Sequence, residues 1–204
     1  MSVADRSIDP RIKESAKEEF LQKGFLDASL QEICKNAGVT TGALYKRFKG
    51  KEELFCTLVE STVQDLEEVV RQKSVLPATL TDEQLKKAWD MDREYMQWWF
   101  NYLYDRYDEM RLLLVFSDGT KYANFEHEWV ESMSHTTYAY YKEAQRRGLT
   151  KTDISEKEMH VMLSSFWTAI CEPLVHGFSK KEAGRISDLM CVLFDWYKML
   201  GFER

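Results

Sequence analysis

The spacing of apolar residues predicts helices from the start of the chain. Ile12, Ala16 and Phe20 recur every four residues, which places them on one face of a helix, and Gly24 supplies its C-terminal stop. The sequence Ser-Leu-Gln-Glu at 29–32 is a capping box, in which a serine and a glutamate satisfy each other's backbone N–H groups. A second helix is therefore predicted to begin there.

A third, short helix follows a glycine. Gly38 interrupts the second helix, and Thr40 is placed to cap the next one. Lys51 then begins a long amphipathic helix to about Lys73, and Pro77 ends that segment.

The rest of the chain shows the same kinds of helix start and stop signals. Capping boxes at 81–84, 155–158 and 179–182 each open a helix, and glycines or polar breaks close them. No segment alternates apolar and polar residues over the length of a strand. The chain is therefore predicted to be all-α with about nine helices, and those of this part cover 81–104, 107–116, 120–147, 155–177 and 180–200.

The first three helices have the lengths and connection of a helix-turn-helix. They fit within about 50 residues, and the second and third are joined by a tight turn that contains Gly38. A generic helical bundle is the alternative. We therefore expect a DNA-binding domain over 1–50, a connecting helix over 51–73, and a larger helical domain over 74–204.

The third helix has an outward surface that suits a DNA groove. On a helical wheel Leu44 faces inward, while Gly42 and Lys46 lie nearly opposite it. A glycine inside so short a helix costs about 1 kcal/mol of helix propensity. Close approach to DNA, where no Cβ is tolerated, would explain why it is there.

Charge is divided unevenly along the chain. The net charge of −6 alone argues against nucleic-acid binding, but residues 1–51 carry 10 Lys and Arg against 7 Asp and Glu. The run 35–51 holds five basic residues and no acidic one. Such a run can neutralise phosphates and release their counterions.

The stretch 37–54, AGVTTGALYKRFKGKEEL, resembles the signature of the TetR (tetracycline repressor)/AcrR-type family of bacterial transcriptional regulators. The resemblance covers about residues 10–58, with Arg47 at a position where the family often carries histidine or another polar residue. It implies that the third helix faces an operator and that Ser29 and Lys51, at the starts of two helices, hold phosphates. Helix capping alone is the alternative for Ser29, packing for Tyr45, and simple solvation for Lys49. The DNA-binding residues predicted are Ser29, Thr40, Thr41, Gly42, Ala43, Tyr45, Lys46, Lys49 and Lys51.

The last predicted helix has two apolar seams. One contains Met190 and Leu193, and the other contains Leu189, Val192 and Trp196. A helix with two apolar seams is either buried all round or shared with another subunit. With the family resemblance, this predicts a homodimer through 155–177 and 180–200, which presents two recognition helices to double-stranded DNA.

The resemblance also implies a cavity for a small-molecule effector among the middle helices, which are rich in aromatic residues and methionine. Such a pocket suits a hydrophobic ligand, planar or cationic, because aromatic faces attract cations. Plain core packing is the alternative for each residue taken singly. The effector-binding residues predicted are Trp98, Trp99, Tyr102, Phe125, Trp129, Met133 and Phe166.

Other kinds of site are not indicated. The four cysteines are scattered, and no two histidines have the spacing of a shared metal face, so no metal or cofactor is expected. No nucleophile motif or Gly-rich phosphate loop points to an enzyme. No membrane span or secretory signal is seen, which predicts a cytoplasmic protein. The function predicted is a dimeric repressor that a small hydrophobic effector releases from a palindromic operator. The alternatives are an activator of the same fold and a helical ligand-binding module with a vestigial DNA-binding domain.

Overall fold

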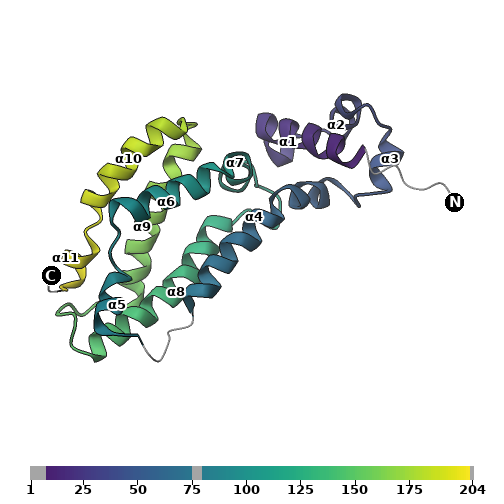
Figure 1. Ribbon diagram of the computed structural model, residues 1–204. Helices are drawn as coiled ribbons and strands as arrows, with labels where there is room; N and C mark the ends of the chain where they lie inside the picture. Colours follow the sequence, from purple (N-terminus) through teal and green to yellow (C-terminus); the bar gives the residue numbers. More distant parts are fainter. Residues whose placement is uncertain (1–7, 75–79, 203–204) are drawn as a thin grey trace. The chain divides into compact units, whose positions relative to one another are not determined.

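A computed structural model describes residues 8–74 and 80–202, and the regular elements within them are helices (Figure 1). The prediction of an all-α chain is confirmed. One isolated β-bridge joins Thr150 to Phe202. The helices are α1 (Ile8–Asp27), α2 (Leu30–Ala37), α3 (Thr41–Tyr45), α4 (Lys51–Ser74), α5 (Asp82–Lys87), α6 (Arg93–Tyr104), α7 (Tyr107–Val115), α8 (Phe125–Arg146), α9 (Glu156–Val175), α10 (Lys180–Leu193) and α11 (Trp196–Leu200).

The chain divides into two compact units, and the division falls inside α4. The first unit runs to Asp65 and also contains Arg106–Phe125; the second contains Leu66–Asp105 and the chain from Glu126 onward. The first unit thus takes in α7 as well as α1, α2 and α3. The functional division predicted from the sequence, at residues 50 and 73, stays a prediction.

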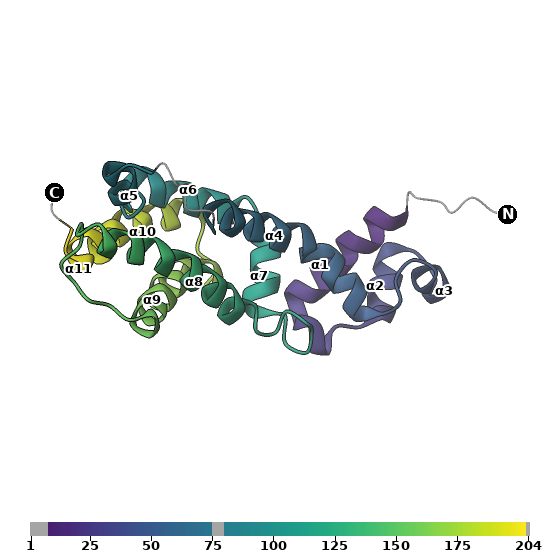
Figure 2. The ribbon, with the colours of Figure 1, turned by 90° about the horizontal axis from the view of Figure 1, so that it is seen from below.

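In the first unit α1, α2 and α3 lie together around a small aromatic core (Figure 2). Phe20 and Phe25 of α1 both meet the ring of Phe55 of α4 edge-on, with centroids 5.2 and 5.6 Å away. The buried hydroxyl of Ser15 donates to the carbonyl of Ile33 at 3.0 Å and so ties α1 to α2. The apolar face of α1 that the spacing predicted is therefore the face that packs against α2 and α4.

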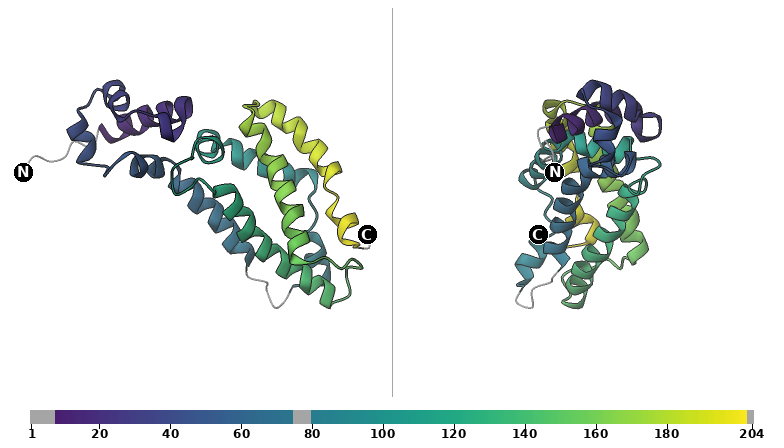
Figure 3. Two further views of the ribbon diagram at one scale, coloured as in Figure 1. Left: turned by 180° about the vertical axis from the view of Figure 1, so that it is seen from behind. Right: turned by 90° about the vertical axis from the view of Figure 1, so that its right-hand side faces the viewer.

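In the second unit α10 packs along α6 and also contacts α9, beside which it is seen in Figure 3. Arg93 of α6 donates two hydrogen bonds of 2.7 Å to the carboxylate of Asp188 of α10. The ring of Trp167 of α9, 1% exposed, packs against the rings of Trp99 of α6 and Trp129 of α8. These contacts leave the opposite face of α10 without a partner helix in the part of the chain that the structure describes.

The single helix predicted over 81–104 is wrong, because the chain breaks between Lys87 and Arg93. Trp89 turns inward in this break, is 3% exposed, and packs on Trp196 with ring centroids 6.3 Å apart. Asp92 then restarts the helix as the N-cap of α6, accepting from the backbone N–H of Tyr95 at 2.8 Å. Burial of a large indole outweighs the few backbone hydrogen bonds of a continuous helix.

The single helix predicted over 180–200 is also wrong, because α10 ends at Leu193 and α11 begins at Trp196. Phe194 leaves the helix and packs edge-on against Phe166, with centroids 5.2 Å apart. Asp195 caps α11 by accepting from the N–H of Lys198 at 3.0 Å. With the break at 88–92, this accounts for eleven helices among the described residues where nine were predicted.

The helix predicted over 120–147 begins later, at Phe125. Residues 117–124 form turns, with Gly119 at φ 84°. The hydroxyl of Ser117 donates to the carbonyls of Leu113 and Tyr122, at 2.8 and 3.1 Å. Such side-chain bonds to the backbone compete with helical ones, so the segment turns before α8 starts.

Candidate DNA-binding surface and ligand cavity

The short helix α3 is held by its cap and by two buried side chains. Thr40 is the N-cap, and its hydroxyl accepts from the N–H of Ala43 at 3.2 Å, as predicted. Leu44 is fully buried and Phe48 nearly so. Arg47 forms an ion pair with Asp9 of α1 and donates to the carbonyl of Ala43 at 3.1 Å. These contacts fix which face of α3 is turned outward.

The outward face of α3 and its C-cap includes Gly42 and Lys46, which the wheel placed opposite Leu44. Thr41, Gly42 and Lys46 are exposed, Tyr45 is 57% exposed, and Ala43 is partly covered. Tyr45 is therefore available for contact with another molecule. Contact of these residues, and of Thr40, with DNA stays a prediction.

Gly42 has no structural reason to be glycine. Its φ is not positive, and a Cβ added there would meet only the hydroxyl of Thr40, at 4.0 Å, an ordinary contact. Gly38, by contrast, has φ 62° and caps α2, where a side chain would be strained. The glycine at 42 thus lowers helix propensity without relieving any contact within the first unit.

The five basic residues of 35–51 differ in what they contact. Lys35 pairs with Glu32 at 3.1 Å on the surface, and Arg47 with Asp9. The exposed ammonium groups of Lys46 and Lys49 have no acidic partner among the described residues. These two lysines are the cations of the run that remain available for phosphates.

Lys51 is partly exposed, and its ammonium is bonded to carbonyl groups of the same unit. Its ammonium donates to the carbonyls of Leu26 and Ala28, at 2.9 and 3.0 Å, and lies 4.8 Å from the centre of the Phe25 ring. These bonds satisfy carbonyl groups just beyond the kink at Gly24 and anchor the start of α4 to the end of α1. The sequence assigned Lys51 to a phosphate, and its contacts give it a structural role in addition.

Ser29 caps α2, but the capping box predicted at 29–32 is wrong. The Ser29 hydroxyl accepts from the N–H of Glu32 at 3.5 Å, while the N–H of Ser29 donates at 3.0 Å to the carboxylate of Glu19 on α1. Glu32 instead pairs with Lys35 on the surface. The backbone N–H of Ser29 therefore donates to the buried carboxylate of Glu19, 5% exposed, on another helix and not to Glu32 of its own helix.

Burial by itself raises the pKa of Glu19, but the hydrogen bonds that its carboxylate accepts outweigh that effect. The ammonium of Lys23 donates at 2.9 Å and the N–H of Ser29 at 3.0 Å, so the pKa of Glu19 lies below its ordinary value. The ionised carboxylate is therefore the form that holds α1 and α2 together.

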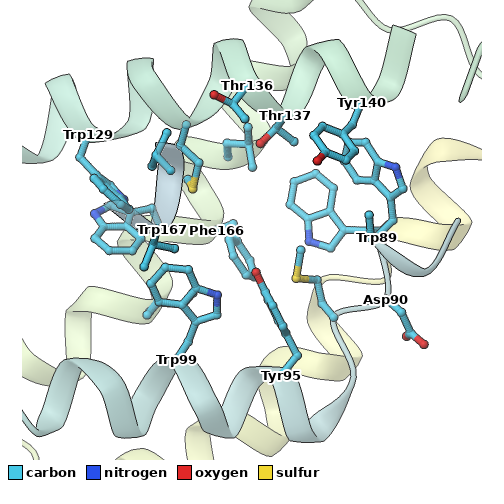
Figure 4. A pocket seen from close by; sticks show the side chains of 18 of the residues that line it. Trp89, Asp90, Tyr95, Trp99, Trp129, Thr136, Thr137, Tyr140, Phe166 and Trp167 are labelled. Atoms are coloured by element: carbon cyan, nitrogen blue, oxygen red, sulfur yellow. The ribbon is translucent and has the colours of Figure 1, made fainter. Parts of the chain in front are cut away.

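The second unit encloses a cavity of about 280 Å³ (Figure 4). Its walls come from the end of α4, the break between α5 and α6, and helices α6, α8 and α9, with Trp196 of α11. Lys87 at the end of α5, and Ala88 and Asp90 of the break, are exposed, whereas Trp129 and Trp167 are buried. The cavity therefore has a polar end near solvent and an apolar end within the unit.

Four of the residues predicted for an effector line this cavity: Trp99, Trp129, Met133 and Phe166. The other three lie elsewhere. Trp98 is 44% exposed and stacks on Tyr102 with centroids 5.1 Å apart, and Phe125 belongs to the first unit. On a helix, adjacent residues such as Trp98 and Trp99 point in different directions, which an aromatic count cannot distinguish.

Sequence reasoning missed the remaining lining residues. Trp89 and Trp196 enter the cavity only because the two predicted helices break beside them. Thr136, Thr137 and Tyr140 form a polar strip along α8, visible in Figure 4. The i, i+1, i+4 spacing of this strip was a usable signal for one face of α8.

Three acidic residues of the second unit, each at or near a helix end, are engaged outside the cavity. Asp92 caps α6, Glu126 accepts from the hydroxyl of Thr168 at 3.1 Å, and Glu172 pairs with His176 at 2.8 Å. None of the three lines the cavity.

The exposed face of α10 is apolar. Leu189, Val192 and Leu193 are 69%, 80% and 71% exposed and follow the i, i+3, i+4 spacing of one helix face. Trp196, placed in the same seam by the sequence, is buried because the chain bends before it. The apolar seam that remains on the surface is therefore shorter than predicted and includes Leu193.

Within the described ranges, no cluster of three or more His, Cys, Asp or Glu residues is arranged to hold a metal ion. No described helix is both long and apolar enough to cross a membrane. The cysteines are free thiols, and burial, followed by the nearby Glu126 and Glu172, raises the pKa of Cys171 well above its ordinary value.

The first unit matches a known family in sequence. The profile of "Bacterial regulatory proteins, tetR family" matches residues 12–57. Over 57 residues, 28% of this chain, the sequence is 42% identical to the HTH-type transcriptional regulator SrpR of Pseudomonas putida. The matches cover 27%, 42% and 24% of the first three curated relatives, so the chain spans less than half of their length.

Similarity over the whole chain is weaker in sequence and clear in fold. The HTH-type transcriptional repressor AcnR of Corynebacterium glutamicum is 24% identical over 93% of this chain and 96% of its own length. The tetR-family regulator PfmR of Thermus thermophilus superposes with a TM-score of 0.61 at 17% identity, over 96% of this chain and 97% of that one. A tetR-family regulator of Streptomyces coelicolor gives the same TM-score at 18% identity, over 95% and 90%. Residues 12–57 thus carry the N-terminal sequence of the tetR family of bacterial regulatory proteins, and the chain as a whole has the fold of solved tetR-family regulators.

Proposed function

We propose that the protein is a dimeric transcriptional repressor that leaves its operator when a small molecule occupies the cavity of the second unit. The observation that carries the DNA-binding part is the exposed face of α3. There Gly42 has no internal reason to be glycine, and the ammonium of Lys46 has no acidic partner among the described residues. Such a face fits a major groove, with Thr41 and Tyr45 beside the bases and Lys46 and Lys49 near phosphates.

Dimerisation follows from the exposed face of α10. Three large aliphatic side chains, Leu189, Val192 and Leu193, lie on it in one stripe. Monomeric proteins rarely expose contiguous apolar surface of this kind, and a second copy of the same face is self-complementary about a two-fold axis. A dimer would present two α3 helices to the two halves of a palindromic operator.

Helix α4 supplies a physical route between ligand and DNA. It begins at Lys51, six residues after α3 ends, and Val69 and Val70 near its other end line the cavity. A ligand that displaces these valines would move a continuous helix whose start is bonded to the end of α1 through Lys51. The ligand can shift the equilibrium only by binding one position of α4 more tightly than the other.

The test is a footprint on DNA selected from a random pool by the purified protein. The proposal expects a palindromic protected site with half-sites about one helical turn apart. It also expects the footprint to block transcription by RNA polymerase in a run-off assay. No protected site would refute the DNA-binding role, and stimulated transcription would assign the protein as an activator of the same fold.

A further inference from the structure

One wall of the cavity carries hydroxyl groups. Thr136, Thr137 and Tyr140 share one face of α8, and all three are half-buried and line the cavity. Their hydroxyl groups have no hydrogen-bond partner in the described part of the chain, and the oxygens keep accessible surface. In Figure 4 the oxygens of Thr137 and Tyr140 lie on the side of α8 that faces Tyr95 and Trp89 across the cavity. A molecule in the cavity can therefore meet these hydroxyl groups.

These hydroxyl groups are satisfied either by water or by a ligand. Burial raises the pKa of Tyr140 above its ordinary value, and no hydrogen bond offsets this effect. Tyr140 is therefore a neutral phenol at neutral pH, and like a threonine hydroxyl it can both donate and accept. A ligand that covers these groups must replace their hydrogen bonds to water, because an unsatisfied hydroxyl group in an apolar surrounding is unfavourable.

The hydroxyl groups are confined to one end of the cavity. The same face of α8 continues toward its N-terminus with Met133 and Trp129, and Trp129 packs on Trp167 with ring centroids 5.2 Å apart. Both indole rings are at most 5% exposed. In Figure 4 Trp129 and Trp167 lie at the end of the cavity opposite Tyr140. The cavity therefore has one apolar end and one end that offers hydrogen bonds.

The wall offers no buried charge. Among its described residues only Lys87 and Asp90 are charged, and both are exposed and have opposite signs. Water and salt screen charges in such positions, so neither residue selects a charged ligand strongly. An ionised group deeper in the cavity would lose its hydration without an opposite charge to replace it. The wall therefore favours an uncharged ligand.

The volume of the cavity limits the size of this ligand. A cavity of about 150 Å³ binds benzene, and this one measures about 280 Å³. The rings of Trp99, Phe166 and Trp167 line it, and aromatic side chains pack favourably against a flat aromatic molecule, edge-on or face-on. A flat molecule of about two rings thus fits both the volume and the walls.

We propose that the cavity binds an uncharged aromatic molecule of about two rings that carries a hydroxyl or carbonyl group at one end, hydrogen-bonded to Thr137 and Tyr140. This names the chemical class of the effector and rests on the proposed function only in treating the cavity as the effector site. Of the planar or cationic ligands that the aromatic composition suggested, it selects the planar kind and excludes the cationic kind.

The test compares four naphthalenes that differ in one substituent. 2-Naphthol carries a hydroxyl group, 2-methylnaphthalene has nearly the same shape without it, and 2-naphthoate and 2-naphthylmethylammonium carry a negative and a positive charge. Binding to the full chain is measured by calorimetry at neutral pH without DNA. 2-Naphthol should bind at least tenfold more tightly than 2-methylnaphthalene, because a methyl group would cover the hydroxyl groups of the wall without satisfying them. It should also bind more tightly than either ion.

Two variants remove a hydroxyl group and keep the shape of the side chain. Tyr140→Phe and Thr137→Val should each weaken the binding of 2-naphthol about fivefold and should not weaken that of 2-methylnaphthalene. Tyr138→Phe is the matched control, because Tyr138 is also half-buried on α8 but does not line the cavity, and it should change neither affinity. In protein labelled with carbon-13 at tyrosine Cζ, the signal that Tyr140→Phe removes should shift more with 2-naphthol than with 2-methylnaphthalene.

Each outcome decides the proposal. If 2-methylnaphthalene binds as tightly as 2-naphthol, if either ion binds best, or if none of the four binds, the inference is wrong. It is also wrong if Tyr140→Phe or Thr137→Val leaves the affinity for 2-naphthol unchanged. If 2-naphthol binds as expected and no footprint is found on DNA, the ligand class stands and the proposed regulatory function fails. A footprint without binding of 2-naphthol gives the reverse result, so the two proposals can fail separately.

Discussion

Replacing Gly42 by alanine should change folding stability and DNA affinity in opposite directions. The position is exposed, its φ is not positive, and the added methyl group would meet only the Thr40 hydroxyl at 4.0 Å. Alanine in place of a helical glycine contributes about 0.5–1 kcal/mol. For a chain of this length that raises the melting temperature by roughly 1–4 °C.

The same methyl group should weaken operator binding. If the backbone at Gly42 approaches the base edges, a Cβ moves α3 outward in both subunits of a dimer. Loss of one good base contact costs about 1–3 kcal/mol, so the dimer should lose more than tenfold in affinity. The loss should be larger on the selected operator than on unrelated DNA, because phosphate contacts tolerate a small displacement.

The assays are a thermal melt and a fluorescence-anisotropy titration with operator and unrelated DNA. Gly184→Ala is the matched control, since Gly184 is an exposed helical glycine of α10 with nothing within 4 Å of a built Cβ. It should stabilise the protein to a similar degree and leave DNA affinity unchanged. If Gly42→Ala binds the operator as tightly as the wild type, close approach to DNA does not explain the glycine. If it lowers the melting temperature, the description of the site as open is wrong.

Three further substitutions test the ion pairs and surfaces described above. Glu19→Gln should destabilise the protein by about 1–2 kcal/mol at neutral pH. Because folding lowers the pKa of the Glu19 carboxyl, its contribution to stability is fully present above the unfolded-state pKa and is lost as pH falls through the lower folded-state pKa. The melting temperatures of wild type and variant should therefore converge between pH 7 and pH 3, and a constant difference would contradict the assignment. Lys46→Ala should weaken binding to all DNA sequences and reduce the slope of log affinity against log salt by about one per subunit; a loss confined to the operator would assign Lys46 to a base. Leu189→Asp should convert the dimer to a 24.1 kDa monomer in analytical ultracentrifugation. Leu26→Asp changes a leucine of similar exposure outside α10 and should leave the dimer intact. If the chain stays dimeric after Leu189→Asp, another surface forms the interface.

The helices were predictable from the sequence wherever their signals are local. Capping boxes at 81–84, 155–158 and 179–182 begin α5, α9 and α10 as expected, because both partners of each box lie within one turn. The box at 29–32 failed because the competing partner, Glu19, belongs to another helix. Local spacing cannot show which of two glutamates a backbone N–H will meet after the helices pack.

The same limit explains the cavity. Trp89 and Trp196 were assigned to continuous helices, where one of them would point at solvent or at a dimer partner. Burial of both indoles in one cluster is favourable by several kcal/mol, enough to outweigh the backbone hydrogen bonds lost at each break. The breaks are products of tertiary packing, and the residues that they bring into the cavity were therefore missed.

Lys51 shows how a recognisable sequence motif can misdirect an experiment. Its place in the motif predicts a phosphate contact, which makes Lys51→Ala an obvious variant for a test of DNA binding. The structure shows its ammonium donating to two carbonyls and lying over the Phe25 ring, so removing it disturbs the junction of α1 and α4 whether or not DNA is present. Its loss would weaken binding to every sequence, which is also what a phosphate contact predicts. Substitutions of Lys46 and Lys49 can test phosphate contact without disturbing internal packing, because neither side chain has an acidic partner among the described residues. The electrostatic part of DNA recognition should therefore be measured at Lys46 and Lys49, while the phosphate contact of Lys51 stays a prediction beside its structural role.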